Sequence, residues 1–117
     1  EGRVIARTWH GWAADSAAAT AYARHFVDGV LPVLRSTEGF VGAQVLRALV
    51  GTEVEFRVVT YWASMDAVRR FAGEDPDAAV VSEDAARVLA RFESRVRHHE
   101  VVELPDDVGV IARRRPA

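Results

Sequence analysis

The sequence predicts an α+β fold of the ferredoxin-like type, with β-α-β-β-α-β order and a four-stranded antiparallel sheet. Three observations support this. Four stretches alternate between apolar and polar residues, as strands do. Helical spacing of apolar residues follows the first and third of them, and a glycine turn joins the second to the third. We therefore expect the strand order 4-1-3-2, with the helices on one face.

The third predicted strand and its helix lie in residues 53–73. Alternation places one apolar set on the face that the helix would cover: Val54, Phe56, Val58, Thr60 and Trp62. Ser64 then has the character of a helix N-cap, Val68 and Phe71 recur at helical spacing, and Gly73 stops the run.

The first strand is expected over residues 3–12, with Val4, Ala6, Thr8, His10 and Trp12 on one face. An alanine-rich helix follows from Asp15-Ser16 to Ser36. Gly29 and Pro32 interrupt it, so a kink or restart is expected, with the proline in a first turn.

The second strand, residues 40–50, turns back through Gly51-Thr52 as a hairpin. A third helix begins at Ser82 and faces inward through Ala85, Val88, Leu89 and Phe92. The fourth strand covers residues 93–102. Between the helices, the loop 74–82 contains an apolar pair and is expected to fold against the domain.

The second face of the sheet is predicted to be too apolar to remain in water. The residues assigned to it are Ile5, Trp9, Val45, Leu49, Val59 and Tyr61. A homodimer whose sheets close into a barrel would cover them, so we expect a dimeric α/β barrel.

Composition limits the possible functions. The 117 residues form one domain, 1–102, followed by a tail, 103–117, that includes Arg113–Arg115. A net charge of −2 gives no reason to expect nucleic acid, and the absence of cysteine excludes thiolate chemistry. No apolar run approaches the ~20 residues of a membrane span, so a cytoplasmic protein is expected.

Several stretches carry a family resemblance over residues 3–102. The segment VVTYWASMDAVRRFAG, the Glu38-Gly39-Phe40 entry to the second strand and the closing VRHHEV resemble the antibiotic biosynthesis monooxygenase domain family. The resemblance implies a dimeric α/β barrel. Some members oxygenate polycyclic aromatic phenols without metal or flavin, and others bind and degrade haem.

The family's functional residues do not transfer directly. Haem-degrading members use Asn, Trp and His where this chain has Thr8, Phe71 and about Val81. Phenol-oxidising members use Asn, Trp and Tyr, and this sequence contains no Asn.

The predicted function is a small cofactor-independent monooxygenase acting on an aromatic or polyketide-like substrate between sheet and helices. His10 and His98 are the predicted catalytic residues, because imidazole can take a phenolic proton near neutral pH. The predicted substrate-binding residues are Trp12, Tyr22, Phe26, Trp62 and Phe71.

Four alternatives remain open. Both histidines could be structural. His10, His98 and Glu100 could form a 2-His-1-carboxylate iron site. The protein could bind haem or another hydrophobic ligand without catalysis, or serve only as a dimerisation module. His25 is expected on the surface.

Overall fold

The computed structural model describes residues 3–108. Its strands are β1 (Ile5–Ala13), β2 (Phe40–Val50), β3 (Glu53–Trp62), β4 (Arg91–Phe92) and β5 (Arg97–Glu100). Its helices are α1 (Ser16–His25), the π-helical turn η1 (Phe26–Val30), α2 (Leu31–Arg35), α3 (Met65–Ala72), α4 (Glu83–Val88) and the 3-10 turn η2 (Asp106–Val108). None of the helices described is long and apolar enough to cross a membrane.

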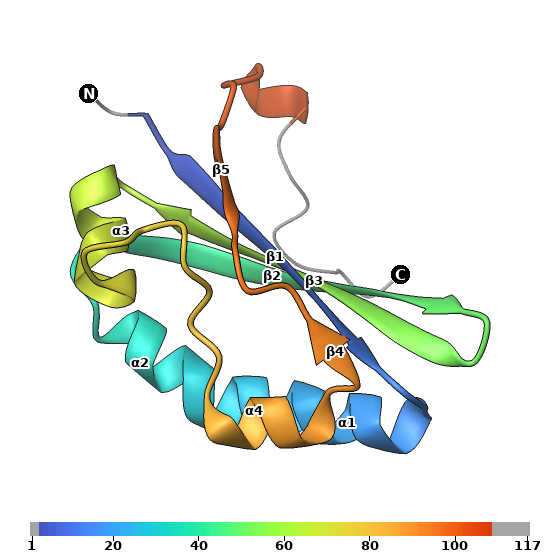
Figure 1. Ribbon diagram of the computed structural model, residues 1–117. Coiled ribbons are helices and arrows are strands. Elements are labelled where there is room, and N and C mark those ends of the chain that lie inside the picture. The colour runs from blue at the N-terminus through green and yellow to red at the C-terminus, as the bar shows by residue number, and fades with distance from the viewer. Residues whose placement is uncertain (1–2, 109–117) are drawn as a thin grey trace.

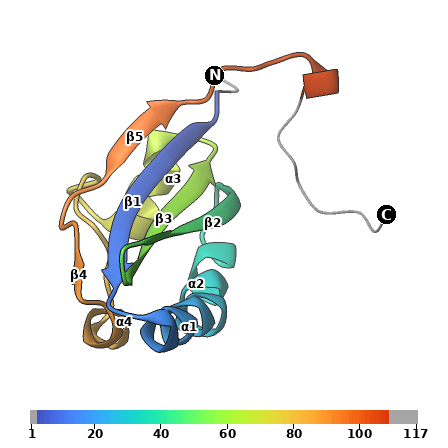
Figure 2. The same ribbon diagram turned by 90° about the vertical axis from the view of Figure 1, so that its right-hand side faces the viewer.

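The strands form one antiparallel sheet in the order β2-β3-β1-β4, with β5 also beside β1 (Figure 1). This confirms the predicted order 4-1-3-2 and the ferredoxin-like α+β fold. Helices α1 to α4 lie on one face of the sheet, here called the helix-covered face (Figure 2). The opposite face is called the outer face.

The first helix begins and breaks as its residues predict. Asp15 caps α1 by accepting a hydrogen bond from the Ala18 N–H at 2.9 Å. The π-helical turn η1 contains Gly29, and α2 restarts with Pro32 in its first turn. Proline fits there because its missing N–H would be unpaired in any first turn.

The hairpin and the helix after it also follow their local signals. Gly51 has φ 64°, a left-handed conformation that glycine adopts without steric cost, and it turns β2 back onto β3. Ser64 caps α3 by accepting from the Ala67 N–H at 3.1 Å.

The core fills the space between the sheet and the helices. Its largest fully buried side chains are Trp62, Phe56, Leu34 and Val68. The first two come from β3, which confirms the predicted apolar face of that strand. Phe71 is only partly buried, although its ring centroid lies 5.5 Å from that of Trp62.

The predicted faces of β1 are wrong. Trp9 pairs with Val58 and is 9% exposed in the helix-covered core, whereas His10 pairs with Arg57 on the outer face. Gly11 makes this possible, because a Cβ there would lie 2.7 Å from the Trp9 ring. The indole N–H of Trp9 donates to the Glu93 carbonyl at 2.8 Å.

The composition of the outer face changes accordingly. Ile5 and Trp9 belong to the helix-covered face, and so do Val45 and Leu49, which pair with Val58 and Val54. Of the six residues assigned to the outer face from the sequence, only Val59 and Tyr61 lie there.

The last predicted strand is divided in two. β4 and β5 both pair with β1, but the chain between them turns toward the 74–82 segment. Ala79 N–H donates to the Ser94 carbonyl at 2.9 Å, and Val96 N–H donates to that of Asp77 at 2.8 Å. These bonds confirm that the loop 74–82 is folded against the domain.

The third helix is shorter than predicted. It ends at Val88, and Leu89 is extended with ψ 140°. Leu89 is still buried, but Phe92 lies in β4 and is 36% exposed. Most of the predicted tail, including Arg113–Arg115, lies outside the described residues.

Candidate active site

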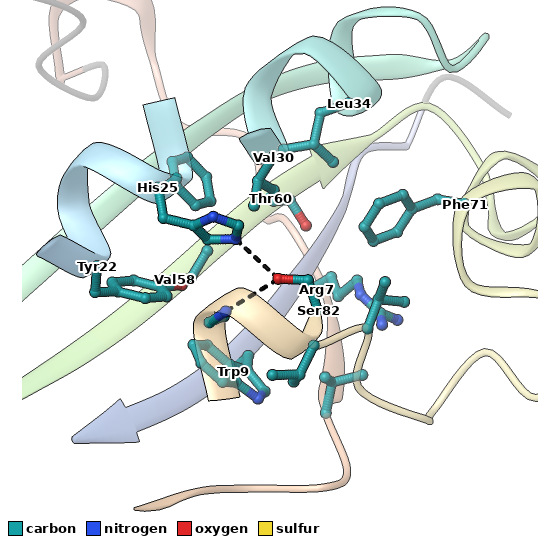
Figure 3. A pocket seen from close by; sticks show the side chains of 15 residues that line it. Arg7, Trp9, Tyr22, His25, Val30, Leu34, Val58, Thr60, Phe71 and Ser82 are labelled. Carbon is teal, nitrogen blue, oxygen red and sulfur yellow. Dashed lines mark hydrogen bonds between the residues drawn. The ribbon is translucent and has the colours of Figure 1, made fainter. Parts of the chain in front are cut away.

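A cavity of about 70 Å³ lies between the helix-covered face of the sheet and the helices. Its walls are mainly apolar. Its polar lining residues include Arg7 and Thr60 from the sheet, His25 from the end of α1, and Ser82, the N-cap of α4 (Figure 3). The sequence predicted a pocket between the sheet and the helices, but none of these four polar residues was among the predicted site residues.

His25 was expected on the surface, and this prediction is wrong. The residue forms part of the cavity wall. Its Nε2 lies 2.9 Å from Oγ of Ser82 (Figure 3). Ser82 Oγ also accepts the Ala85 N–H at 3.1 Å as the N-cap of α4. The serine hydroxyl proton is thus free to point toward the imidazole, and the pair can pass a proton between them.

Gly29 leaves room for the imidazole of His25. A Cβ at this position would lie 3.1 Å from Cε1 and 3.3 Å from Nδ1 of His25. The π-helical turn that contains Gly29 begins directly after His25. Such turns are frequent at functional sites in helices. Here the turn and the glycine together set the position of the ring.

Arg7 is a buried cation in the part of the cavity wall that the sheet provides. It is 4% exposed, and its guanidinium carbon lies 5.7 Å from the centre of the Phe71 ring. Nη1 donates to the Pro76 carbonyl at 2.5 Å and Nη2 to the Ala78 carbonyl at 2.8 Å. Burial lowers the pKa of Arg7 to about 10, against the raising effect of Asp77.

His98 lies behind Arg7 on the same face of the sheet. Its Nε2 is 3.3 Å from Nη1 of Arg7, and its Nδ1 is 3.1 Å from Oδ1 of Asp77. Arginine can only donate a hydrogen bond, so Nε2 of His98 accepts from Arg7. Nδ1 of His98 therefore carries the ring proton and donates a hydrogen bond to the Asp77 carboxylate. Burial and then the Arg7 charge lower the pKa of His98, and both favour this neutral form.

His10 lies on the opposite face, so the prediction that His10 and His98 share one cavity is wrong. Arg57 Nε donates to His10 Nε2 at 2.9 Å, and His10 Nδ1 lies 3.2 Å from Oε1 of Glu93. The ring stacks on Trp12 at a centroid distance of 6.0 Å. These contacts form a polar cluster on the outer face.

The five predicted substrate-binding residues divide into three groups. Tyr22, Phe26 and Phe71 line the cavity. Trp62 is fully buried beside it and donates its indole N–H to Thr60 at 2.8 Å. Trp12 lies on the outer face, and the guanidinium carbon of Arg91 lies 4.6 Å from the centre of the Trp12 ring. Trp12 therefore cannot contact a ligand in this cavity.

The alternative iron site is contradicted by the same geometry. His98 and Glu100 pair with Arg7 and Ile5 and lie on the helix-covered face, while His10 lies on the other side of the sheet. Across residues 3–108, no group of three or more His, Cys, Asp or Glu residues is arranged to hold a metal ion.

Residues 12–76 match the model of the antibiotic biosynthesis monooxygenase family, which is more than half of the chain. No curated protein sequence matches the chain. Similar solved structures include a candidate antibiotic biosynthesis monooxygenase from Caulobacter crescentus CB15. It is 20% identical with a TM-score of 0.62, over 87% of this chain and 92% of that one.

Two further structures are similar in fold. The heme-degrader MhuD from Mycobacterium tuberculosis, with two hemes bound in its active site, is 23% identical with a TM-score of 0.57, over 86% of this chain and 98% of that one. SnoaB, a cofactor-independent oxygenase from Streptomyces nogalater, is 16% identical with a TM-score of 0.54, over 93% of this chain and 100% of that one.

Proposed function

Because this chain belongs to the antibiotic biosynthesis monooxygenase family, we propose that it is a small cofactor-independent monooxygenase-type enzyme. Its substrate is an aromatic or polyketide-like molecule with an acidic phenol or enol, bound between the sheet and the helices. The observation that carries the proposal is the His25–Ser82 pair in the wall of an otherwise largely apolar cavity.

The pair supplies the base that such a reaction needs. A substrate hydroxyl that donates to Ser82 Oγ passes its proton there, as the serine proton moves to Nε2 of His25. The ring carbon of the resulting anion then bonds to O₂, and the distal oxygen takes back the proton that His25 holds, which returns the imidazole to its neutral form. Loss of water carries away the ring hydrogen and leaves a quinone, so the substrate supplies all the electrons.

The segment 74–82 is the part of the wall that would move to admit the substrate. The cavity of about 70 Å³ is smaller than the roughly 300–1,000 Å³ of ligand pockets, so a ring system needs a displaced wall. Val80, Val81 and Ser82 form that part of the lining. Arg7 holds the segment through the Pro76 and Ala78 carbonyls.

The outer face supports the proposal of a homodimer. Leu46 and Val50 are 49% and 55% exposed there. Leu46 pairs with Arg57 of the cluster around His10, and Val50 lies nearer the hairpin turn, where it pairs with Glu53. A second copy of the sheet would cover these apolar side chains. The cavity lies on the other face, so each protomer would keep its own site.

The alternative function is a haem-binding or hydrophobic-ligand-binding protein without catalysis. The neighbour MhuD binds two hemes in its active site, and His25 gives this cavity an imidazole. A hemin titration of the wild type and His25→Gln tests it. A Soret shift that depends on His25 would favour the haem-binding protein.

The oxygenase is tested by oxygen uptake with a naphthol or anthrone substrate in chelator-treated buffer. We expect one O₂ consumed for each quinone formed, with no added flavin or metal. Loss of turnover on chelation, or turnover only after haem is added, would contradict the proposal.

A further inference from the structure

We propose that the cavity stabilises the ionised form of its bound substrate, an aromatic oxyanion, with the guanidinium of Arg7 as counter-ion and His98 as the residue that positions it. The inference rests on the proposed function of the same cavity and adds the class of ligand that it selects. It assigns roles on the sheet side of the cavity, whereas the base lies on the helix side.

The charge of Arg7 is not balanced within the cavity. Of the residues that line it, Arg7 alone carries a permanent charge, and no carboxylate is among them. The described partners of its guanidinium are the Pro76 and Ala78 carbonyls and the ring of His98, which are all neutral. A buried cation with neutral partners creates a positive site that stabilises an anion.

Asp77, the acid whose charge raises the pKa of Arg7, makes its own contacts with other groups. Oδ1 of Asp77 accepts a hydrogen bond from the Nδ1–H of His98, and Oδ2 of Asp77 lies 4.0 Å from Nη2 of Arg95. The Asp77 side chain is 54% exposed, so water weakens its effect on Arg7. The charge on Arg7 therefore remains available to a ligand.

Arg7 also retains donors for that ligand. A guanidinium has five N–H donors, and the contacts with Pro76, Ala78 and His98 use three of them in the described part of the chain. The Phe71 ring beside the guanidinium offers a flat apolar surface. A charge next to an aromatic wall suits an anion that is delocalised over a ring.

His98 acts through Arg7 and has no place in the lining of the cavity. Because Nη1 donates to it, the neutral ring fixes the plane of the guanidinium, and Asp77 fixes the tautomer. This makes His98 a positioning residue. Its role differs from that of a base, although it was singled out for that role in the sequence.

The test is an anaerobic titration with 4-nitrophenol, in which phenolate absorbance reports the ionised fraction of the bound probe. We expect binding to wild type to lower the probe's ionisation midpoint by about one pH unit, a tenfold preference for the anion. Arg7→Met should abolish this shift. Arg57→Met, the same change on the outer face, should leave it intact.

Two comparisons separate this role from a purely structural one. His98→Gln can accept from Arg7 and donate to Asp77, and should keep the shift, whereas His98→Leu should reduce it. Wild type alone should bind 4-nitrophenolate at least tenfold more tightly than the neutral 4-nitroanisole, even if Arg7→Met does not fold. A 4-nitrobenzoate arm distinguishes a carboxylate ligand from a phenolate.

The outcomes are decisive in either direction. Preference for the neutral ether, no binding of either probe, or an unchanged shift in a folded Arg7→Met variant would overturn the proposal. Because O₂ is absent, the anion preference can hold even if no substrate is oxidised, and oxygen uptake can occur without it.

Discussion

Nη1 of Arg7 lies 3.3 Å from Nε2 of His98, whose other ring nitrogen lies 3.1 Å from Oδ1 of Asp77. This relationship joins the cavity wall to the strand β5 and to the 74–82 segment. It also keeps the imidazole neutral, because a protonated ring could not accept from the guanidinium.

The pH dependence of stability tests this state of His98. Its pKa is lowered in the folded protein, so below pH 6.5 the unfolded chain binds more protons at this site. The stability that the neutral His98 contributes to the folded protein is fully present above pH 6.5 and is lost as the pH falls toward the lowered pKa of the folded state. In urea unfolding, the free energy of unfolding should fall less on acidification in His98→Gln than in the wild type. His99→Gln should lose as much as the wild type.

Replacing Gly29 should separate stability from activity. Gly29→Ala places a methyl group 3.1 Å from Cε1 of His25 and should turn the ring away from Ser82. Turnover should fall at least tenfold, while the free energy of unfolding changes by less than about 1 kcal/mol, since alanine favours helices. Gly42→Ala, with no atom within 4 Å, is the control. Equal turnover in both variants would mean that Gly29 does not position His25.

The core prediction concerns two phenylalanines on the helix-covered side. Phe56 is fully buried, so Phe56→Ala should lower the free energy of unfolding by about 3–5 kcal/mol. Phe71 is partly buried and lines the cavity, so Phe71→Ala should cost less. Urea melts compare them directly. A larger loss at Phe71 would show that it supports the core more than the cavity.

The homodimer can be tested with two leucines of β2 that point to opposite faces. Leu46 pairs with Arg57 on the outer face, whereas Leu49 pairs with Val54 on the other. Leu46→Glu should shift the protein from dimer to monomer in sedimentation, because a carboxylate would be buried at the interface. Leu49→Glu should remain dimeric. A wild type that sediments as a monomer at micromolar concentration would rule out the homodimer.

The sequence predicted the fold well because its main signals are local. Ser64, Gly51 and Pro32 act on their own turns, and their caps, turns and breaks are found where expected. The alternation in β3 was unambiguous, because its core face is almost wholly apolar.

The site was harder to predict because its residues break the rules that locate a core. Arg7 occupies a core position that a charged residue normally avoids, which reversed the predicted faces of β1. Its burial depends on the Pro76 and Ala78 carbonyls, which are remote in sequence. His25 lies three residues after Tyr22 and four before Gly29, so the three share one face of a helix. This spacing could have predicted that the imidazole of His25 packs beside Gly29 on the apolar face.

The central claim is that chemistry takes place on the helix-covered face, with His25 as the base. Its most direct test is oxygen uptake by the wild type, His25→Gln and His10→Gln with the same phenolic substrate. Glutamine keeps a hydrogen bond to Ser82 but cannot take the proton, so His25→Gln should lose roughly 10²–10⁴-fold in turnover, and His10→Gln should retain it. The reverse pattern, or full activity in His25→Gln, would contradict the account.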